Sequence, residues 1–147
     1  MIDTDHPDLH RPLGLTLLTG LYLFFFLLSA STFGHPFPLV GHIFQDATAR
    51  MIVFIDSLIC LYLFLGIMKR QLLTWYLLIG YNMAEIVNTI VNLSCISQQE
   101  LEKVLVIQIN TDAMRVNNIA ASLAILLLTQ FIYRNKHYFI YRQKYLF

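Results

Sequence analysis

The chain has 147 residues, of which 57% are hydrophobic and 13% are charged, and its formal net charge is +1. A soluble globular domain carries roughly 25% charged residues, so this composition indicates a membrane protein. A near-neutral chain of this kind lacks the clustered basic face that nucleic-acid binding needs, and we expect no nucleic-acid partner.

Four apolar stretches follow one another along the chain, at about 13–33, 47–68, 72–93 and 114–133. About 20 residues of α-helix cross the roughly 30 Å of hydrocarbon in a bilayer, which matches each stretch. A chain in lipid must satisfy its own backbone hydrogen bonds, so all four should be helices. The sequence therefore predicts an all-α fold, a polytopic four-helix membrane bundle in which residues 1–147 form a single domain.

The first stretch has a signal peptide as its alternative reading. Arg11 precedes the apolar run, and Ser29-Ala30-Ser31 has the small residues of a cleavage site. However, the run is long for a signal peptide, and the preceding segment is acidic, with Asp3, Asp5 and Asp8. We expect the stretch to be retained as a helix.

Lysine and arginine predict the orientation, because cytoplasmic connections are enriched in both. The N-terminus, the second connection and the C-terminal tail carry Arg11, Lys69, Arg70, Arg134, Lys136, Arg142 and Lys144. The other two connections and their flanks carry only Arg50, Lys103 and Arg115. Both termini are therefore predicted to be cytoplasmic. The tail 134–147 mixes aromatic and basic residues, which favours an anchor on the inner leaflet over a partner-docking motif.

The two outer connections differ in character. The segment 34–46 is apolar for a loop and contains Pro36, Pro38 and Gly41, so we expect it to lie in the outer interface. In the third connection, Ser97 followed by Glu100 matches a capping box. This pattern predicts a short interfacial helix between the third and fourth spans. The apolar residues 104–109 would then rest on the membrane or on the bundle.

Polar residues within the spans should face the bundle interior, because lipid cannot satisfy them. At about 100° per residue, one face of the third span and one face of the fourth are polar. These faces hold Asn82, Glu85, Asn88, Thr89 and Asn92, and Arg115, Asn118, Ser122 and Thr129. The second span has Asp46, Arg50 and Ser57 on one side and Asp56 on another. The first span is mainly apolar, so we expect it to face lipid or a partner.

Most of this polar material falls in the outer half of the predicted bundle. We expect Glu85 to pair with Arg50 or Arg115, and Asp56 to be hydrogen-bonded near Asn82. The predicted ligand- or ion-binding set is Glu85, Asp56, Arg50, Arg115, Asn82, Asn88 and Asn118. Three interpretations compete: polar contacts that hold helices together, a cavity open to the outer side, and a proton relay through Glu85 and Asp56.

Histidines and cysteines give weaker signals. His35, His42 and Asp46 could ligate a metal, and a single histidine could bind haem, but their spacing matches no known motif. We therefore predict neither metal nor cofactor. Cys60 and Cys95 form no CxxC pair, and their different depths argue against a mutual disulfide.

Three segments resemble a family of small prokaryotic four-helix membrane proteins. Arg11-Pro12-Leu13-Gly14-Leu15-Thr16 is similar to the family's Arg-Pro-x-Gly-Val-Thr opening, with Leu15 in place of valine. Leu65 to Arg70, followed by Trp75, is similar to its Leu-Gly-Leu-x-(Lys/Arg)-x-x-x-x-Trp hairpin, and Tyr133 to Phe139 resembles its C-terminus without the proline. The polar face of the third span departs from the family pattern. The resemblance implies a prokaryotic inner membrane, plasma or photosynthetic, and brings no catalytic residue.

Three functions follow as hypotheses. The first is a non-catalytic accessory subunit of a larger membrane assembly or a homo-oligomer, because the chain is small and shows no catalytic constellation. The second is a small-molecule or ion-binding protein, such as a transporter component, with an outer cavity around Glu85. The third is a redox or metal protein that uses His35 and His42.

Overall fold

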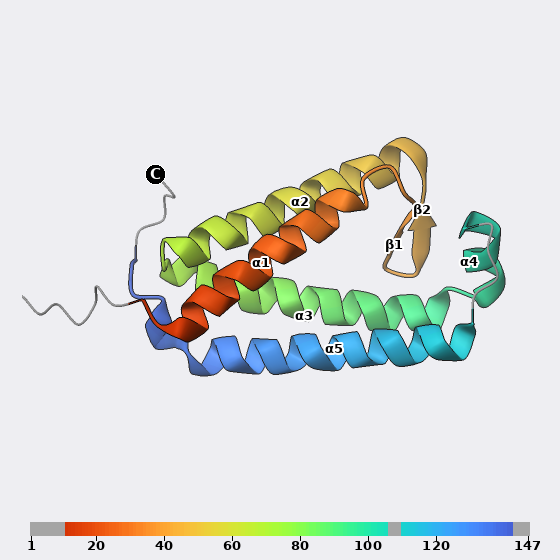
Figure 1. Cartoon of the computed structure of the whole chain (residues 1–147). Helices are drawn as coiled ribbons and strands as arrows, with labels where there is room; N and C mark the ends of the chain where they lie inside the picture. The colour runs from red at the N-terminus through yellow and green to blue at the C-terminus, as the bar shows by residue number, and fades with distance from the viewer. Residues whose placement is uncertain (1–10, 106–109, 143–147) are drawn as a thin grey trace, which may run out of the picture.

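The computed structural model describes residues 11–105 and 110–142. This part of the chain forms five α-helices, one small β-hairpin and a 3-10 turn (Figure 1). In chain order they are α1 Leu13–Ser31, β1 Phe37–Leu39, β2 His42–Phe44, α2 Asp46–Met68, α3 Leu72–Cys95, α4 Gln98–Leu105, α5 Thr111–Arg134 and η2 Lys136–Tyr138. The predicted all-helical fold class is confirmed, and the long helices begin and end within three residues of the predicted stretches.

The four long helices form two antiparallel pairs, α1 with α2 and α3 with α5. The pairs converge at one end of the molecule and diverge at the other (Figure 1). We call these the closed end and the open end. The closed end contains the α2–α3 turn and η2, together with the first and last described residues. The open end contains the β-hairpin and α4.

The hydrophobic core lies at the closed end, where every long helix contributes to it. Its buried members are Leu15, Leu18, Tyr22, Leu63, Ile67, Trp75, Leu78, Ile132 and Phe139. In this core α2 packs tightly against α3 at Gly66, where an added Cβ would overlap the Thr74 side chain. In lipid, helices associate through such close packing rather than by leaving water, so a glycine at this point is structurally important.

The α2–α3 turn ends α2 in a Schellman motif. The Gln71 N–H donates to the Gly66 carbonyl, and the Arg70 N–H donates to that of Ile67. Arg70 has the left-handed backbone conformation that this motif requires, with φ 53°. The tail then packs onto the turn, because the Leu72 N–H donates to the Tyr141 carbonyl at 2.8 Å and the Arg70 side chain donates to that of Tyr138 at 2.9 Å.

The first connection differs from the prediction. Residues 34–46 were expected to form a loop in the outer interface, but β1 and β2 pair there as an antiparallel hairpin. The two turn residues, Val40 and Gly41, have φ values of 48° and 80°. Two successive positive φ angles are typical of a type I′ turn, which matches the twist of the flanking strands.

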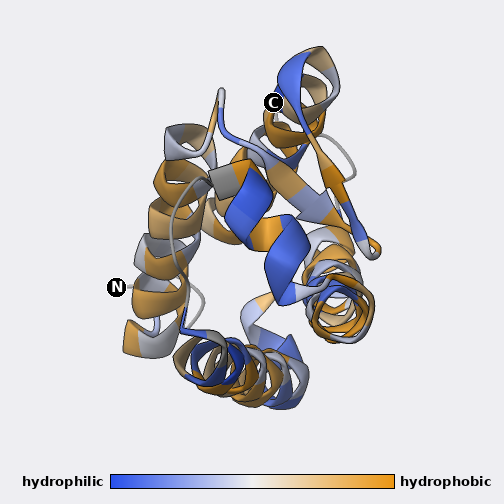
Figure 2. Cartoon of the chain, turned by 90° about the vertical axis from the view of Figure 1, so that its right-hand side faces the viewer, coloured by the Kyte–Doolittle hydropathy of each residue, from blue (hydrophilic) through white to orange (hydrophobic). Residues whose placement is uncertain are grey.

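The predicted capping box is present at the start of α4. The Ser97 N–H donates to the Glu100 carboxylate at 3.1 Å, and the Glu100 N–H donates to Ser97 Oγ at 3.3 Å. The short helix between α3 and α5 therefore exists, and it is mainly hydrophilic, in contrast to the long helices (Figure 2). The prediction for residues 104–109 falls largely on 106–109, which lie outside the described residues.

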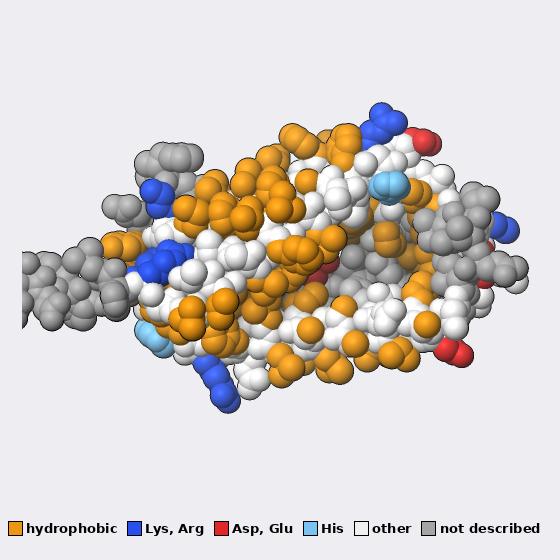
Figure 3. Space-filling view, viewed as in Figure 1, with side chains coloured by type: hydrophobic (Ala, Val, Ile, Leu, Met, Phe, Trp, Pro, Cys, Tyr) orange, Lys and Arg blue, Asp and Glu red, His pale blue; other side chains and the backbone are white. Residues whose placement is uncertain are grey.

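Three of the helices are long and apolar enough to cross a membrane: Leu13–Ser31, Asp46–Met68 and Asp112–Arg134. The helix α3 has 24 residues, but its polar face keeps it out of this group. Hydrophobic side chains cover the middle of the face seen in Figure 3, and charged side chains gather at its two ends. These observations fit integration into a membrane.

Candidate functional site

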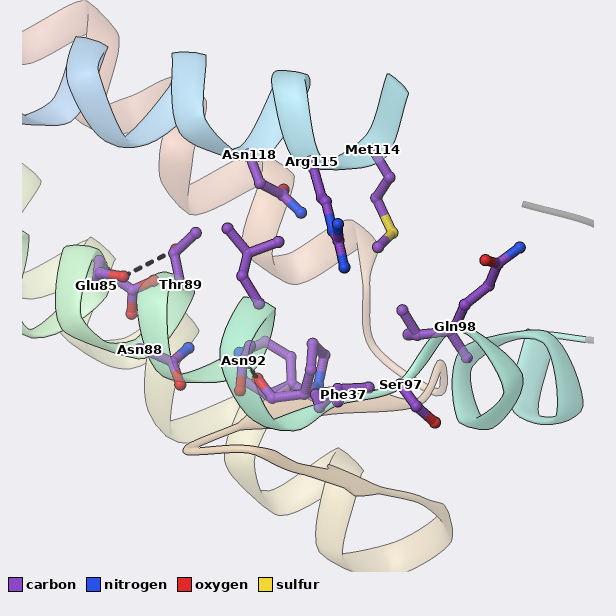
Figure 4. A pocket seen from close by; sticks show the side chains of 14 residues that line it. Phe37, Glu85, Asn88, Thr89, Asn92, Ser97, Gln98, Met114, Arg115 and Asn118 are labelled. Atoms are coloured by element: carbon purple, nitrogen blue, oxygen red, sulfur yellow. Dashed lines mark hydrogen bonds between the residues drawn. The ribbon is translucent and has the colours of Figure 1, made fainter. Parts of the chain in front are cut away.

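A cavity of about 500 Å³ lies at the open end, between α3 and α5. The hairpin and the start of α4 complete its wall (Figure 4). Its polar lining comes from Glu85, Asn88, Thr89, Asn92, Ser97, Gln98, Arg115 and Asn118, and its apolar lining from Phe37, Pro38, Leu93, Ile96, Leu101 and Met114. This cavity contains most of the polar side chains that the two helices direct inward.

Helical periodicity explains how these residues come together. Glu85, Asn88, Thr89 and Asn92 recur at intervals of three and four residues, so they lie along one face of α3. Arg115 and Asn118 are likewise three residues apart on α5. Because α3 and α5 pack antiparallel, these two faces meet across the cavity, and the labelled side chains of α5 point toward α3 in Figure 4.

The two asparagines nearest the hairpin hold it against α3. Asn88 Oδ1 accepts from the Val40 N–H at 2.8 Å, and Asn92 Oδ1 accepts from the Gly41 N–H at 2.7 Å. Asn92 Nδ2 also donates to the Pro38 carbonyl at 3.2 Å. These bonds satisfy backbone groups of the turn and fix the wall formed by β1. The asparagine face of α3 thus has a structural role that its periodicity did not reveal.

Four polar groups in the cavity have no partner among the described residues. Within the described part of the chain, no hydrogen bond or ion pair engages the Glu85 carboxylate, Asn88 Nδ2, the Arg115 guanidinium or the Asn118 amide. The Glu85 backbone carbonyl accepts from Thr89 Oγ1, and this bond does not involve the carboxylate (Figure 4). If these groups only held helices together, they would be hydrogen-bonded to one another. Their lack of partners among the described residues therefore favours a binding cavity over helix-joining contacts.

The structure places the predicted binding residues in different surroundings. Glu85, Asn88, Arg115 and Asn118 line the cavity together. Arg50 is exposed on α2 and lies outside the cavity lining. In the described residues, neither Arg50 nor Arg115 forms the ion pair with Glu85 that we expected. The sequence placed Arg115 on the correct face of its helix, but its side chain remains uncommitted beside the cavity.

Asp56 belongs to a separate network that joins three helices. Its carboxylate accepts from Ser29 Oγ at 2.5 Å and from Tyr81 Oη at 2.8 Å. Ser57 and Cys60 extend the network, with Ser57 Oγ 3.1 Å from Ser29 Oγ and Cys60 Sγ 3.3 Å from Tyr81 Oη. The expected hydrogen bonding of Asp56 near Asn82 is present, because one donor is Tyr81, the residue before Asn82, and the other is Ser29 of α1.

Asn82 is 2% exposed and has its own partner on α1. Tyr22 Oη donates to Asn82 Oδ1 at 2.7 Å, while Asn82 Nδ2 has no hydrogen-bond partner among the described residues. Through Tyr22 and Ser29, α1 makes polar contacts to the interior. It is therefore less lipid-like than its composition suggested.

The histidines and cysteines that the sequence singled out lie outside the cavity lining. His35 and His42 are exposed near the hairpin, and among the described residues no group of three or more His, Cys, Asp or Glu side chains could hold a metal ion. Cys60 is buried, Cys95 is exposed, and both are free thiols.

Sequence reasoning missed the residues that close the cavity from outside α3 and α5. Phe37 and Pro38 enter through β1, and Ser97 and Gln98 through the start of α4. The available signal for the hairpin was a two-residue link, Val40-Gly41, between two short apolar segments. Comparison with family models, curated proteins and solved structures finds no match for the chain.

Proposed function

We propose that this chain crosses the membrane four times, with α3 as the fourth spanning helix and both termini in the cytoplasm. At 1.5 Å per residue, the 24 residues of α3 extend about 36 Å, enough to span a bilayer. Its one charged side chain, Glu85, lines the cavity. The prokaryotic inner membrane implied by the sequence resemblance is part of this proposal.

Charge distribution supports the orientation. Among the described residues, the closed end carries Arg11, Lys69, Arg70, Arg134, Lys136 and Arg142 and no Asp or Glu. The open end mixes Arg50, Lys103 and Arg115 with Asp46, Glu100, Glu102 and Asp112. Under the positive-inside rule the closed end is cytoplasmic, and the cavity then opens toward the outer side. In this orientation α4, at the open end, would lie in the outer interface.

The function we propose is the binding of a small polar solute in this outer cavity. The observation that carries the proposal is the set of uncommitted polar groups of Glu85, Asn88, Arg115 and Asn118. Small-molecule sites are typically concave pockets in which a few convergent polar groups fix the ligand, and these four residues provide such groups beside apolar walls. The alternative is that polar residues of the spans only hold helices together. That role fits Asp56 and Tyr22, whose hydrogen bonds join helices, better than it fits the four cavity residues.

Binding fits the structure better than passage across the membrane. Toward the closed end, the helices meet through the buried apolar side chains of Leu63, Ile67, Leu78 and Ile132. A solute or proton that continued past Glu85 and Asp56 would encounter this core. We therefore propose a receptor or the binding component of a transporter, rather than a channel or carrier that moves a solute or proton across the membrane by itself.

Thermal unfolding of the purified protein against a panel of amino acids, amines, dicarboxylates, sugars and phosphate esters tests this function. A solute that binds only the folded state stabilises it by about 2.7 kcal/mol at 100 times its Kd, which raises Tm. Asn118→Trp fills the cavity and should remove the shift. Leu127→Trp, at an exposed position on the same helix, should retain it. A shift of equal size in both variants, or no shift with any solute, would refute the proposal.

A subunit role is the second candidate, and the surface of α5 favours it. This helix packs mainly on α3 and leaves Val116, Ile119, Leu123 and Leu127 exposed. Ala120 and Ala124 are also exposed, at the four-residue spacing that lets a second helix approach closely. The native mass of the complex extracted from membranes should then exceed that of one chain and decrease in an Ala120→Leu/Ala124→Leu variant. A monomer with no other subunit would exclude this role.

A further inference from the structure

The cavity has charges of opposite sign toward its two ends. Glu85 lies about 10 Å nearer the closed end than Asn92, because the two are seven residues apart on α3 and each residue adds 1.5 Å. Arg115 lies in the first turns of α5, beside the Asn92 end of the cavity, whereas Glu85 lies at the far end (Figure 4). The site is therefore an elongated one, with a carboxylate at its inner end and a guanidinium toward its outer end.

The inner end suits a cation. The Glu85 carboxylate is half-buried and lines the cavity. The Asp56 carboxylate already accepts two hydrogen bonds, whereas that of Glu85 accepts none from the described residues. Burying an uncompensated carboxylate is costly, and a bound ammonium group would compensate it.

The outer end suits an anion. Arg115 is exposed at the rim, and its guanidinium forms no ion pair with the described part of the chain. A guanidinium presents a planar fork of donors that matches a carboxylate or a phosphate. Asn118, one turn further in on the same face, offers an uncommitted amide to the middle of the same ligand.

We propose that the ligand is a zwitterion, with an ammonium group beside Glu85 and a carboxylate or phosphate beside Arg115. This inference rests on the proposed binding function and names its ligand class. About 10 Å of α3 separate Glu85 from Asn92, and Arg115 lies beside Asn92 (Figure 4). This spacing favours a ligand whose charges are several bonds apart over the adjacent pair of an α-amino acid. Two sources supply this chemistry: a free ω-amino acid, and the phosphoethanolamine headgroup of a membrane lipid.

Calorimetric titration of the full chain in detergent tests the free source, with 5-aminopentanoate as the probe. Pentylamine and pentanoate each keep one of its charges. We expect the zwitterion to bind at least tenfold more tightly than either. Glu85→Gln should remove its advantage over pentanoate, and Arg115→Gln its advantage over pentylamine. Arg50→Gln, which removes an exposed arginine outside the cavity lining, is the matched control and should retain both.

Native mass spectrometry tests the lipid source, with phosphatidylethanolamine and phosphatidylglycerol offered in equal amounts. Preferential retention of phosphatidylethanolamine, reduced in Glu85→Gln and Arg115→Gln but not in Arg50→Gln, would identify the headgroup as the ligand. Equal retention of both lipids, together with 5-aminopentanoate binding no more tightly than its single-charge analogues, would overturn the zwitterion. The proposed function would still stand if another solute shows a shift that Asn118→Trp removes, and both would fail if none does.

Discussion

At the residue scale, two glycines of the long helices have opposite surroundings. A Cβ on Gly66 would overlap Thr74 of the neighbouring helix, whereas a Cβ on Gly80 would meet nothing within 4 Å. The two positions are alike in the sequence, since each lies within an apolar span. The sequence cannot distinguish them, because the difference depends on the distance between α2 and α3.

We therefore predict that Gly66→Ala destabilises the protein and Gly80→Ala does not. Overpacking of a close contact costs about 1–3 kcal/mol, and Thr74 is itself fully buried and has little room to move. At Gly80 the change should be neutral or stabilising by up to about 1 kcal/mol, because alanine has the higher helix propensity. Thermal unfolding in detergent measures both. Equal stability of the two variants would contradict the close approach.

The polar residues show how far residue-level prediction reached. Periodicity placed Asn82, Glu85 and Asn88 on one face of α3, and the cavity contains two of them. It did not identify their partners, because a helical wheel gives the direction of a side chain but not the neighbour it meets. Asp56 illustrates this limit: Tyr81 reaches it from α3 and Ser29 from α1, and neither contact follows from spacing along a single helix.

At the element scale, local signals predicted helices well and the hairpin poorly. The capping box at Ser97 identified α4 because both of its hydrogen bonds lie within four residues. The hairpin depends instead on bonds to α3, which is about 50 residues away in the sequence. Its turn also uses Val40, a β-branched residue that rarely adopts a positive φ.

Val40→Asn should stabilise the hairpin. Left-handed backbone costs an ordinary residue roughly 1–2 kcal/mol, and asparagine reduces this cost, so the Asn-Gly pair suits a type I′ turn. The Val40 side chain is 60% exposed, so its removal sacrifices little packing. We expect a higher Tm and slower hydrogen exchange of the hairpin amides. Val40→Thr keeps the β-branch and is the matched control, with no gain expected. Equal behaviour of the two variants would show that the turn is not strained.

At the scale of the whole molecule, the two ends have different tasks. The closed end combines the apolar core with a cluster around Trp75. Lys136 Nζ makes a cation–π contact with the Trp75 ring, 4.6 Å from its centroid, and Trp75 Nε1 donates to the Ile132 carbonyl at 2.9 Å. Such a cluster suits the headgroup region of a membrane. The open end replaces the core with the hairpin and the cavity. The binding site that we propose requires this combination of a rigid base and an accessible opposite end.

The crossing by α3 is the step on which this picture depends, and two cysteine positions test it. Cys95 ends α3 and is exposed, whereas Cys60 is buried, so a membrane-impermeant maleimide should modify intact cells at Cys95 and Cys95→Ser should abolish the labelling. In the Cys95→Ser background, Lys69→Cys places a thiol just before α3, at the closed end. It should react only after the membrane is opened. Labelling of both positions from one side would show that α3 does not cross, and the cavity would then no longer face outward from a four-helix bundle.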